Sequence, residues 1–312
     1  MASLRRSGYP ILLVIVGPTG VGKTALSLEL AARFNGEIIS ADSRLFYRGM
    51  DIGTDKPGPE ARALVPHHMI DICRPDETVS LGQYKRIAMS AIRSTIGRGH
   101  LPFLVGGTGQ YVKAIVEGWR IPEIAPRARL REALATLGGV ELHRWLAQLD
   151  PMSAGRIDAR NVRRVIRALE VTLVSGRPMS QMQRKTPPEF DIIMLGLHCD
   201  RDLLYERIDA RVDRMLADGL VDEVKRLREQ GHGCDLPAMS GLGYRQVWAY
   251  LDGETNLEEC VERIKFETHR FARQQHNWFR QDDERIRWYD VLDLGWQSRL
   301  MQDVEQLLSN ER

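Results

Sequence analysis

The segment GPTGVGKT at residues 17–24 constrains this chain more than any other part of the sequence. It follows directly on the apolar run ILLVIVG that begins at Ile11, and it meets the pattern G-x-x-x-x-G-K-[ST] with Lys23 and Thr24 at its end. A glycine-rich loop between a buried strand and a helix turns its backbone amides toward an anion at the positive end of that helix. The sequence therefore predicts an α/β protein of the P-loop type.

The loop pattern also predicts which atoms meet the ligand. Lys23 adds a cation to the outer phosphate, and the hydroxyl of Thr24 suits a Mg²⁺ ion that bridges phosphate oxygens, so Thr24 is the expected metal ligand. The pattern requires a diphosphate or a longer phosphate chain but does not distinguish ATP from any other diphosphate. The residues expected to bind the diphosphate are Gly17, Pro18, Thr19, Gly20, Val21, Gly22, Lys23 and Thr24.

Further segments indicate the sheet to which the loop belongs. Short apolar runs predict strands at Ile11–Val16, Glu37–Ser40, His100–Val105 and Asp191–Leu197. A helix is expected directly after the loop, at Lys23–Phe34. Alternating strands and helices favour a parallel sheet covered by helices, in which ligands bind at the carboxyl ends of the strands. The phosphate loop, Asp42 and Thr108 all follow strand ends, so we expect them at one edge of the sheet. After Leu197 only helices are expected.

The stretch 122–189 differs in character from the rest of the chain. It is rich in arginine, helical in pattern, and bracketed by the proline-bearing segments IPEIAP and KTPPEF. We interpret it as a helical insertion domain, and 1–121 with 190–312 as a P-loop core domain with C-terminal helices. Four arginines recur there at helical spacing and are expected to share one face that grips phosphates, although a solvated surface helix is an alternative: Arg160, Arg163, Arg164 and Arg167.

Composition narrows the class of protein. The formal net charge is only +2, so any surface for nucleic acid must be local. The four cysteines are far apart and form no CxxC pair, which argues against a zinc site or a disulfide scaffold and fits a reducing compartment. No run approaches the roughly 20 apolar residues of a membrane span. Two N-terminal arginines precede an apolar run, but that run is too short for a signal peptide. We expect a cytoplasmic monomer with no membrane partner.

Asp42 is the nearest acidic residue that follows the end of a predicted strand. A nucleoside triphosphatase normally places a metal-binding acid after an apolar strand, but the strand that ends at Val105 leads into Gly-Gly-Thr. Asp42 follows the second strand, where a carboxylate could accept a proton from an acceptor that faces the phosphates. The alternative is that Asp42 caps a turn, because Asp-Ser is a favoured turn pair.

Five segments resemble the tRNA dimethylallyltransferases, also called tRNA isopentenyltransferases. In chain order they are ISADSRLFYRGMDIGTDKP (39–57), LVGGTGQYVKA (104–114), RVIRALEV (164–171), GLGYRQ (241–246) and RQQHNWFR (273–280). The C-terminal cysteine/histidine finger of some eukaryotic members is missing, so the resemblance is to the bacterial type. It implies that the loop holds dimethylallyl diphosphate instead of ATP. The dimethylallyl group then moves to N6 of the adenosine immediately 3′ of the anticodon, and pyrophosphate is released.

The resemblance also implies roles for individual residues. Asp42 becomes the expected base that accepts the N6 proton, Lys23 and Thr24 stabilise the departing pyrophosphate, and Arg211 approaches that pyrophosphate. The positions that match segments in contact with the tRNA anticodon stem-loop are Asp42, Ser43, Arg44, Leu45, Thr108, Arg129, Arg163, Arg164, Val165, Ile166, Arg167, Ser240, Gly241, Leu242, Gly243, Tyr244, Arg245, Arg273, Gln274, Gln275, His276, Asn277, Trp278, Phe279 and Arg280.

Recognition of a base within an RNA loop makes further demands on the protein. The adenine must leave its stack before N6 can reach a carboxylate, and splayed bases usually stack on aromatic or arginine side chains. The segment RFARQQHNWFR interleaves arginines with Phe271, Trp278 and Phe279. These aromatic side chains could stack on bases or belong to the core.

Three other functions share part of this pattern. A small-molecule kinase would use the same loop with ATP, but it would not need an arginine-rich insertion. A prenyltransferase acting on free adenine nucleotides would use the same diphosphate chemistry without long RNA-contacting segments. A non-catalytic module could bind a nucleotide only to sense it.

Overall fold

The computed structural model describes residues 8–309, and the two N-terminal arginines behind the signal-peptide interpretation lie outside the described residues. The strands are β1 (Ile11–Val16), β2 (Gly36–Ser40), β3 (His67–His68), β4 (Leu101–Val105), β5 (Asp191–His198) and β6 (Ile286–Asp290). The helices are α1 (Lys23–Arg33), α2 (Pro59–Leu64), α3 (Leu81–Gly97), α4 (Gly109–Val116), α5 (Ala128–Ala135), α6 (Gly139–Leu149), α7 (Pro151–Ala154), α8 (Val162–Ser175), α9 (Met179–Met182), α10 (Arg201–Ala217), α11 (Leu220–Glu229), η1 (Pro237–Ser240), α12 (Tyr244–Leu251), α13 (Leu257–Gln275) and α14 (Trp296–Ser309).

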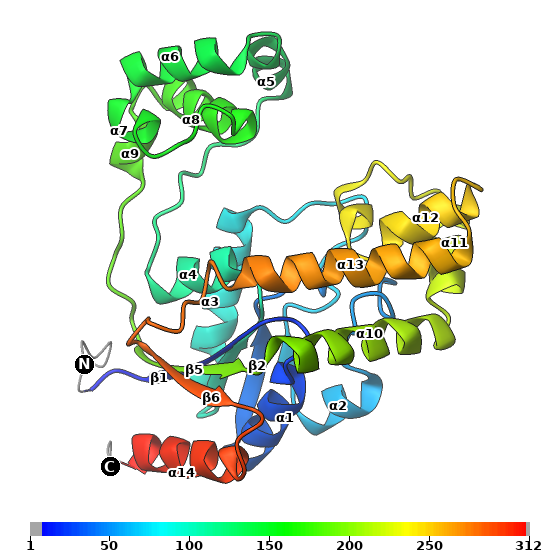
Figure 1. The fold of residues 1–312 in the computed structure, drawn as a ribbon. Helices are drawn as coiled ribbons and strands as arrows, with labels where there is room; N and C mark the ends of the chain where they lie inside the picture. Colours follow the sequence, from blue (N-terminus) through cyan, green and yellow to red (C-terminus); the bar gives the residue numbers. More distant parts are fainter. Residues whose placement is uncertain (1–7, 310–312) are drawn as a thin grey trace. The chain divides into compact units, whose positions relative to one another are not determined.

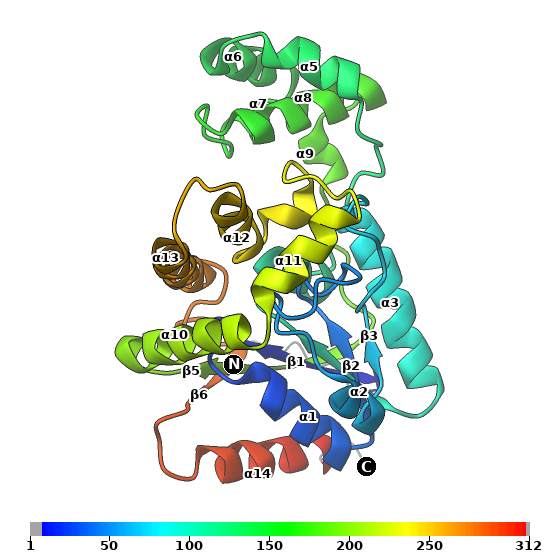
Figure 2. The same cartoon turned by 90° about the vertical axis from the view of Figure 1, so that its right-hand side faces the viewer.

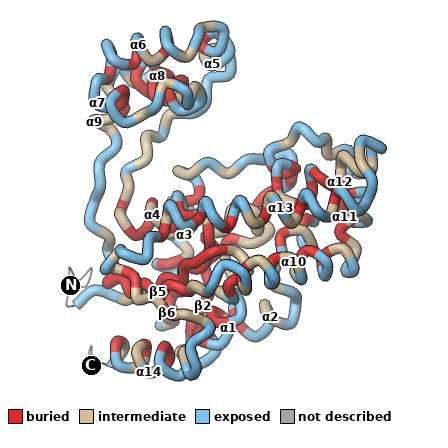
Figure 3. The backbone as a smooth tube through the Cα atoms, viewed as in Figure 1, coloured by how far each residue is buried: buried red, intermediate tan, exposed pale blue. Residues whose placement is uncertain are grey.

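The strands form one sheet in the order β3-β2-β4-β1-β5-β6, and every pair of neighbours is parallel. β1 lies between β4 and β5, with Leu13 opposite Phe103 on one side and Ile193 on the other. Residues 12–16 are completely buried, as expected for a parallel strand covered on both faces (Figure 3). The predicted parallel sheet with helical cover is confirmed.

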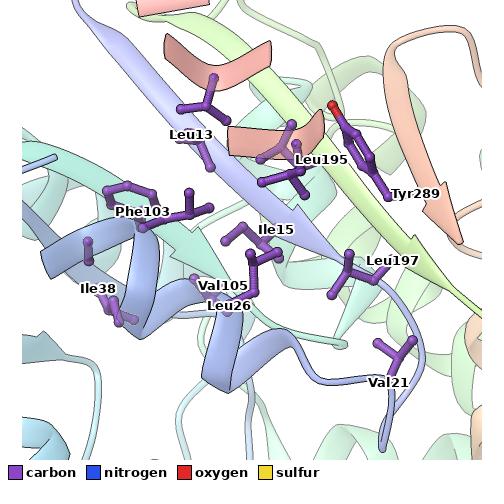
Figure 4. Close-up of a cluster of buried hydrophobic side chains, with 14 of the residues drawn as sticks. Leu13, Ile15, Val21, Leu26, Ile38, Phe103, Val105, Leu195, Leu197 and Tyr289 are labelled. Carbon is purple, nitrogen blue, oxygen red and sulfur yellow. The ribbon is translucent and has the colours of Figure 1, made fainter. Parts of the chain in front are cut away.

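The two faces of the sheet are covered by different helices. Leu26 and Leu30 of α1 and Leu300 and Val304 of α14 share one buried cluster with inward residues of β1, β4 and β5 (Figure 4). α3 also packs on β2 and β4 but contributes nothing to that cluster, so it covers the opposite face (Figure 1). α10 and α13 lie side by side (Figures 1 and 2). None of the helices within residues 8–309 has both the length and the apolar composition needed to cross a bilayer.

Two strands were not predicted from the sequence. β6 follows α13 and pairs with β5, with Leu195 opposite Arg287, so the expectation that only helices follow β5 is wrong. Its sequence IRWYD lacks an apolar run because it is an edge strand that is buried on only part of its surface. β3 has two residues, too few for any periodicity to show. The helix after the loop ends at Arg33, one residue before the expected end.

The chain divides into two compact units, residues 1–112 with 189–312 and residues 113–188. We call them the sheet unit and the helical unit. The first border of this division lies inside α4, and the chain segments on either side of the insertion's helices pair with each other. The Arg120 amide donates to the Arg184 carbonyl at 2.6 Å, and the Thr186 amide donates to the Gly118 carbonyl at 2.8 Å. We call these two paired segments, residues 118–120 and 184–186, the neck. A Cβ at Gly118 would lie 1.7 Å from the Thr186 carbonyl oxygen, so the neck needs a glycine at this position.

The helical unit has its own apolar core and a buried charge network. Leu142 and Leu146 of α6 pack with inward residues of α8. The buried carboxylate of Glu170 accepts hydrogen bonds from the side chains of Arg131 and Arg167 and from the Arg127 amide. Burial by itself would raise the pKa of Glu170, but these donors outweigh it and hold the pKa at about 2. Both arginines are therefore held by one structural carboxylate.

Candidate active site

The phosphate loop has the geometry of an anion cradle. Gly17, Gly20 and Gly22 all have positive φ, at 146°, 82° and 105°, a region that other residues rarely adopt. A Cβ at Gly17 would also lie 2.5 Å from the Leu197 carbonyl oxygen of β5. Gly22 is the N-cap of α1, whose first turn contains no acidic residue. The orphan amides at this helix end are therefore free of a competing carboxylate from that turn.

The side chain of Lys23 is held over the loop by a backbone contact. Its Nζ donates to the Pro18 carbonyl oxygen at 2.7 Å. Burial lowers the pKa of Lys23 to about 8, Asp42 acts against this shift, and Arg211 adds to it. These effects also show that a carboxylate and a guanidinium both lie near the ammonium group. A bound phosphate would favour the charged ammonium form that burial disfavours.

Asp42 sits in a short turn after β2. Its amide donates to the Ser40 hydroxyl at 3.1 Å, and its Oδ1 accepts from the Arg44 amide at 2.9 Å. Asp42 thus makes the turn-forming contact that the sequence allowed. Within the described chain, Oδ2 of this half-buried residue has no hydrogen-bond partner. One carboxylate oxygen shapes the loop while the other remains available to a substrate.

The loop after β4 packs directly against the loop after β2. A Cβ at Gly106 would lie 2.4 Å from the backbone of Ala41, so only glycine fits there. The Thr108 amide donates to the Ala41 carbonyl oxygen at 3.3 Å, and the Thr108 hydroxyl accepts from the Ser43 amide at 3.4 Å. The glycine pair and Thr108 therefore fix the turn that presents Asp42.

Gln275, the last residue of α13, joins both loops. Its Oε1 accepts from the Thr19 amide of the phosphate loop at 2.8 Å, and its Nε2 donates to the Gly107 carbonyl oxygen at 2.9 Å. A Cβ at Gly107 would lie 2.1 Å from that Nε2. Because the side chain is buried and both bonds run to backbone atoms, α13 is fixed to the floor of the site.

α10 contributes a row of arginines. Arg211 donates to the Thr19 hydroxyl at 3.0 Å, and its Nε lies 3.4 Å from a carboxylate oxygen of Asp55. Arg207 and Arg214, at i−4 and i+3, line the same cavity, and they were not predicted. Their spacing around Arg211 was a signal in the sequence, but mixed charges along that helix obscured it.

Two adjoining cavities meet at these residues. The phosphate-side cavity, of about 510 Å³, is lined by the loop, the α10 arginines and Asp42. The outer cavity, of about 390 Å³, is lined by the Asp42 turn, Thr108, the segment 240–242 and the end of α13. Asp42 faces both cavities. The prediction that the phosphate loop, Asp42 and Thr108 gather at one edge of the sheet is confirmed.

The predicted residues fall into three groups. Those that line the phosphate-side cavity are Thr19, Gly20, Gly22, Lys23, Thr24, Asp42, Leu45, Arg211 and Gln275. Those that line the outer cavity also include Ser43, Arg44, Thr108, Ser240, Gly241, Leu242, Tyr244, Gln274 and Trp278. Those of the sheet unit that line neither are Gly17, Pro18, Val21, Gly243, Arg245, Arg273, His276, Asn277, Phe279 and Arg280. Of these, Phe279 is a core residue, and Arg280 is paired with Asp282.

Glu223 of α11 was not predicted, although it shapes the outer cavity. Its side chain is 1% exposed and accepts from the amides of Asp51, Ile52 and Gly53 at 2.8–3.1 Å, and from the Tyr244 hydroxyl at 2.6 Å. The Glu223 carboxylate therefore fixes the turn at residues 51–53 against α12. Nothing local in the sequence of an amphipathic helix distinguishes such an acid from a surface one.

The helical unit contains the remaining predicted residues, and it corrects the expected arginine face. Arg160 precedes α8 and is bonded to Asp158, and Arg167 is bonded to Glu170. Val165 and Ile166 are core residues of this unit. Arg129, Arg163 and Arg164 are exposed, and no carboxylate among the described residues pairs with Arg163 or Arg164. The exposed basic pair of α8 is Arg163 and Arg164, not a row of four.

A divalent ion would find one protein ligand in the phosphate loop. Thr24 is exposed and lines the phosphate-side cavity. Within residues 8–309 no three or more histidine, cysteine, aspartate or glutamate side chains gather as a metal site. A hydroxyl beside a phosphate cradle fits Mg²⁺, which keeps much of its water and takes its other oxygens from phosphates.

The parallel sheet and the glycine loop at its carboxyl edge define an α/β protein of the P-loop type. The chain belongs to the IPP transferase family, whose model matches residues 45–282. It is 51% identical over 304 residues to a tRNA dimethylallyltransferase of Thermomicrobium roseum, covering 96% of this chain and 92% of the relative.

Solved structures agree with this family. A tRNA isopentenylpyrophosphate transferase of Bacillus halodurans has a TM-score of 0.70 and 39% identity, with 96% of each chain covered. A eukaryotic dimethylallyltransferase acting on tRNA has a TM-score of 0.85 and 29% identity, with 97% of this chain and 80% of the other covered.

Proposed function

We propose that this protein transfers the dimethylallyl group of dimethylallyl diphosphate to N6 of the adenosine immediately 3′ of the anticodon in tRNA and releases pyrophosphate. The observation that carries the proposal is the position of Asp42, which faces both the phosphate-side cavity and the outer cavity. A donor on the loop and a base in the outer cavity would meet at this carboxylate. The relatives are tRNA dimethylallyltransferases, which supports the same reaction.

The chemistry follows from the residues around Asp42. The N6 lone pair attacks the allylic carbon, the bond from that carbon to the diphosphate oxygen breaks, and its electron pair leaves with pyrophosphate. Lys23, Arg211 and the loop amides stabilise the charge that grows on this leaving group. Asp42 accepts the N6 proton, and its Arg44 hydrogen bond holds the carboxylate in place.

The proposal includes Mg²⁺, held by the Thr24 hydroxyl together with diphosphate oxygens and water. When bound, the ion would add positive charge beside the departing pyrophosphate. The exposed arginines of the helical unit and the residues around the outer cavity would bind the anticodon stem-loop. A cytoplasmic location and a monomeric state belong to the same proposal.

Replacing Asp42 by asparagine tests the proposed base. Asn keeps an oxygen for the Arg44 amide, so the turn survives, but it cannot accept a proton. We expect transfer from labelled dimethylallyl diphosphate to tRNA to slow on the order of 10²–10⁴-fold, with tRNA binding nearly unchanged. Asp55→Asn is the matched control, because Asp55 lines the same cavity and its backbone, at φ 53°, suits asparagine. We expect this control to stay within about tenfold of wild type.

The acceptor assay separates the other functions. Label is offered with tRNA, with AMP or without an acceptor, and ATP consumption is followed in parallel. Labelling that requires tRNA supports the proposal. Labelling of AMP, or ATP turnover without prenyl transfer, contradicts it, and a near-normal rate for Asp42→Asn removes Asp42 from the role of base.

A further inference from the structure

Among residues 8–309, seven line both cavities, and only one of these seven has an apolar side chain. They are Thr19, Asp42, Thr54, Gly107, Arg211, Phe271 and Gln275. If the donor lies on the phosphate loop and the acceptor in the outer cavity, as proposed above, the reacting carbon lies where the two cavities share their wall. Among the seven residues of that shared wall, a five-carbon hydrocarbon group has one apolar side chain to contact, Phe271.

The position of Phe271 on α13 directs it toward this wall. It lies four residues before Gln275, so the two side chains share one face of the helix. Gln275 is fixed to the Thr19 amide and the Gly107 carbonyl oxygen. Phe271 is 41% exposed, although its neighbour Ala272 is fully buried, so the ring borders open space instead of filling the core.

Charge in the cavity gives this ring a second role. As the bond to the diphosphate breaks, its electron pair goes to pyrophosphate and positive charge spreads over the allylic carbons until the bond to N6 forms and Asp42 takes the proton. Lys23 and Arg211 stabilise the leaving anion, but they repel a neighbouring cation. The face of an aromatic ring carries partial negative charge and attracts cations.

We propose that Phe271 contacts the dimethylallyl group and stabilises the positive charge that develops on it. This inference rests on the proposed function. The ring is unchanged by the reaction, and nothing is oxidised or reduced. Phe271 would act on the rate of the chemical step more than on the affinity for the diphosphate, because the charge is present only in the transition state.

Single-turnover transfer with saturating dimethylallyl diphosphate tests the proposal. Phe271→Leu keeps an apolar side chain but removes the aromatic face, and we expect the rate to fall roughly 3- to 30-fold. Phe271→Tyr should stay within about threefold of wild type. Pyrophosphate affinity and melting temperature should not change for either variant. Phe266→Leu is the matched control: Phe266 lies on the same helix, is 61% exposed and lines neither cavity.

Fluorinated phenylalanines at position 271 separate charge from shape. Each fluorine weakens the negative face while the size of the ring changes little, so the logarithm of the rate should fall steadily with the number of fluorines. A flat series, or a Phe271→Leu rate within twofold of wild type, overturns the inference. Because these comparisons are made against wild-type transfer to tRNA, a wild-type protein that transfers nothing would instead defeat the proposed function.

Discussion

The protonation of Lys23 links ligand binding at the phosphate loop to pH. Because the pKa of Lys23 is about 8, a fraction of the molecules has a neutral Lys23 amine at mildly alkaline pH when no ligand is bound. A diphosphate favours the ammonium form, so binding should raise the pKa of Lys23 and take up a proton. The burial that lowers this pKa thus makes the empty loop sensitive to pH.

This sensitivity predicts the pH dependence of diphosphate binding. The test ligand is an unreactive alkyl diphosphate, whose terminal phosphate titrates at about pH 6 and is therefore already ionised at pH 7. Its affinity should be constant from pH 7 up to the Lys23 pKa of about 8 and should then fall as the pH rises. Calorimetry at pH 8.5 in buffers of different ionisation enthalpy should detect the proton uptake. Lys23→Arg, which keeps its charge over this range, should remove both effects. An equally steep fall in Lys23→Arg would assign the pH dependence to another group.

At the scale of residues, the sequence predicted positions near strand ends better than side-chain partners. The loop, Asp42 and Thr108 each follow an apolar strand directly, so their meeting follows from the parallel sheet alone. Glu223 and Gln275 act on backbone atoms far away in the chain, and nothing local distinguishes them. Arg167 differs from them, because its buried partner Glu170 lies three residues further along the same helix, α8, and this spacing was a local signal in the sequence.

At the scale of elements, the arginines in and just before α8 differ in what they bind. Arg160 and Arg167 are occupied by carboxylates, whereas Arg163 and Arg164 face solvent. Helical spacing predicted one row of four because it does not show where the helix begins, and Asn161 caps α8 one residue after Arg160. β6 was missed for a related reason, since an edge strand needs no apolar run.

The α8 pair predicts how tRNA binding depends on salt. Replacing Arg163 and Arg164 together by glutamine should weaken tRNA binding and reduce the slope of log affinity against log salt by about 1 to 2, because two phosphate contacts are lost. Filter binding at several salt concentrations measures the slope. Arg160→Gln should leave it nearly unchanged, since that guanidinium is bonded to Asp158. An unaltered slope in the double variant would place the RNA contacts elsewhere.

At the scale of the whole molecule, the helical unit begins and ends at one neck. Residues 118–120 and 184–186 pair through backbone hydrogen bonds, so the chain leaves and re-enters the sheet unit through adjacent segments. An insertion with adjacent ends places little constraint on its host, and such segments tolerate replacement. Each unit also has its own buried core.

Removing the helices of the insertion should therefore leave the sheet unit folded. Replacing residues 122–182 by a short glycine–serine linker retains the paired segments of the neck. We expect a cooperative thermal transition and diphosphate affinity close to wild type, but much weaker tRNA binding and little transfer. Calorimetry and tRNA titration measure these properties. Loss of the cooperative transition would show that the sheet unit depends on the helical unit for its stability.

The double hydrogen bond of Gln275 has a consequence for how the two substrates affect each other. The side-chain amide of Gln275 contacts the phosphate loop, and Gln275 is also the last residue of α13. It lies within residues 273–280, the segment that resembles an RNA-contacting segment of the family. If RNA binding shifted that helix end, this hydrogen bond would carry the shift to the Thr19 amide. Thermodynamic linkage then requires reciprocity. If bound diphosphate multiplies the affinity for tRNA by some factor, bound tRNA must multiply the affinity for the diphosphate by the same factor.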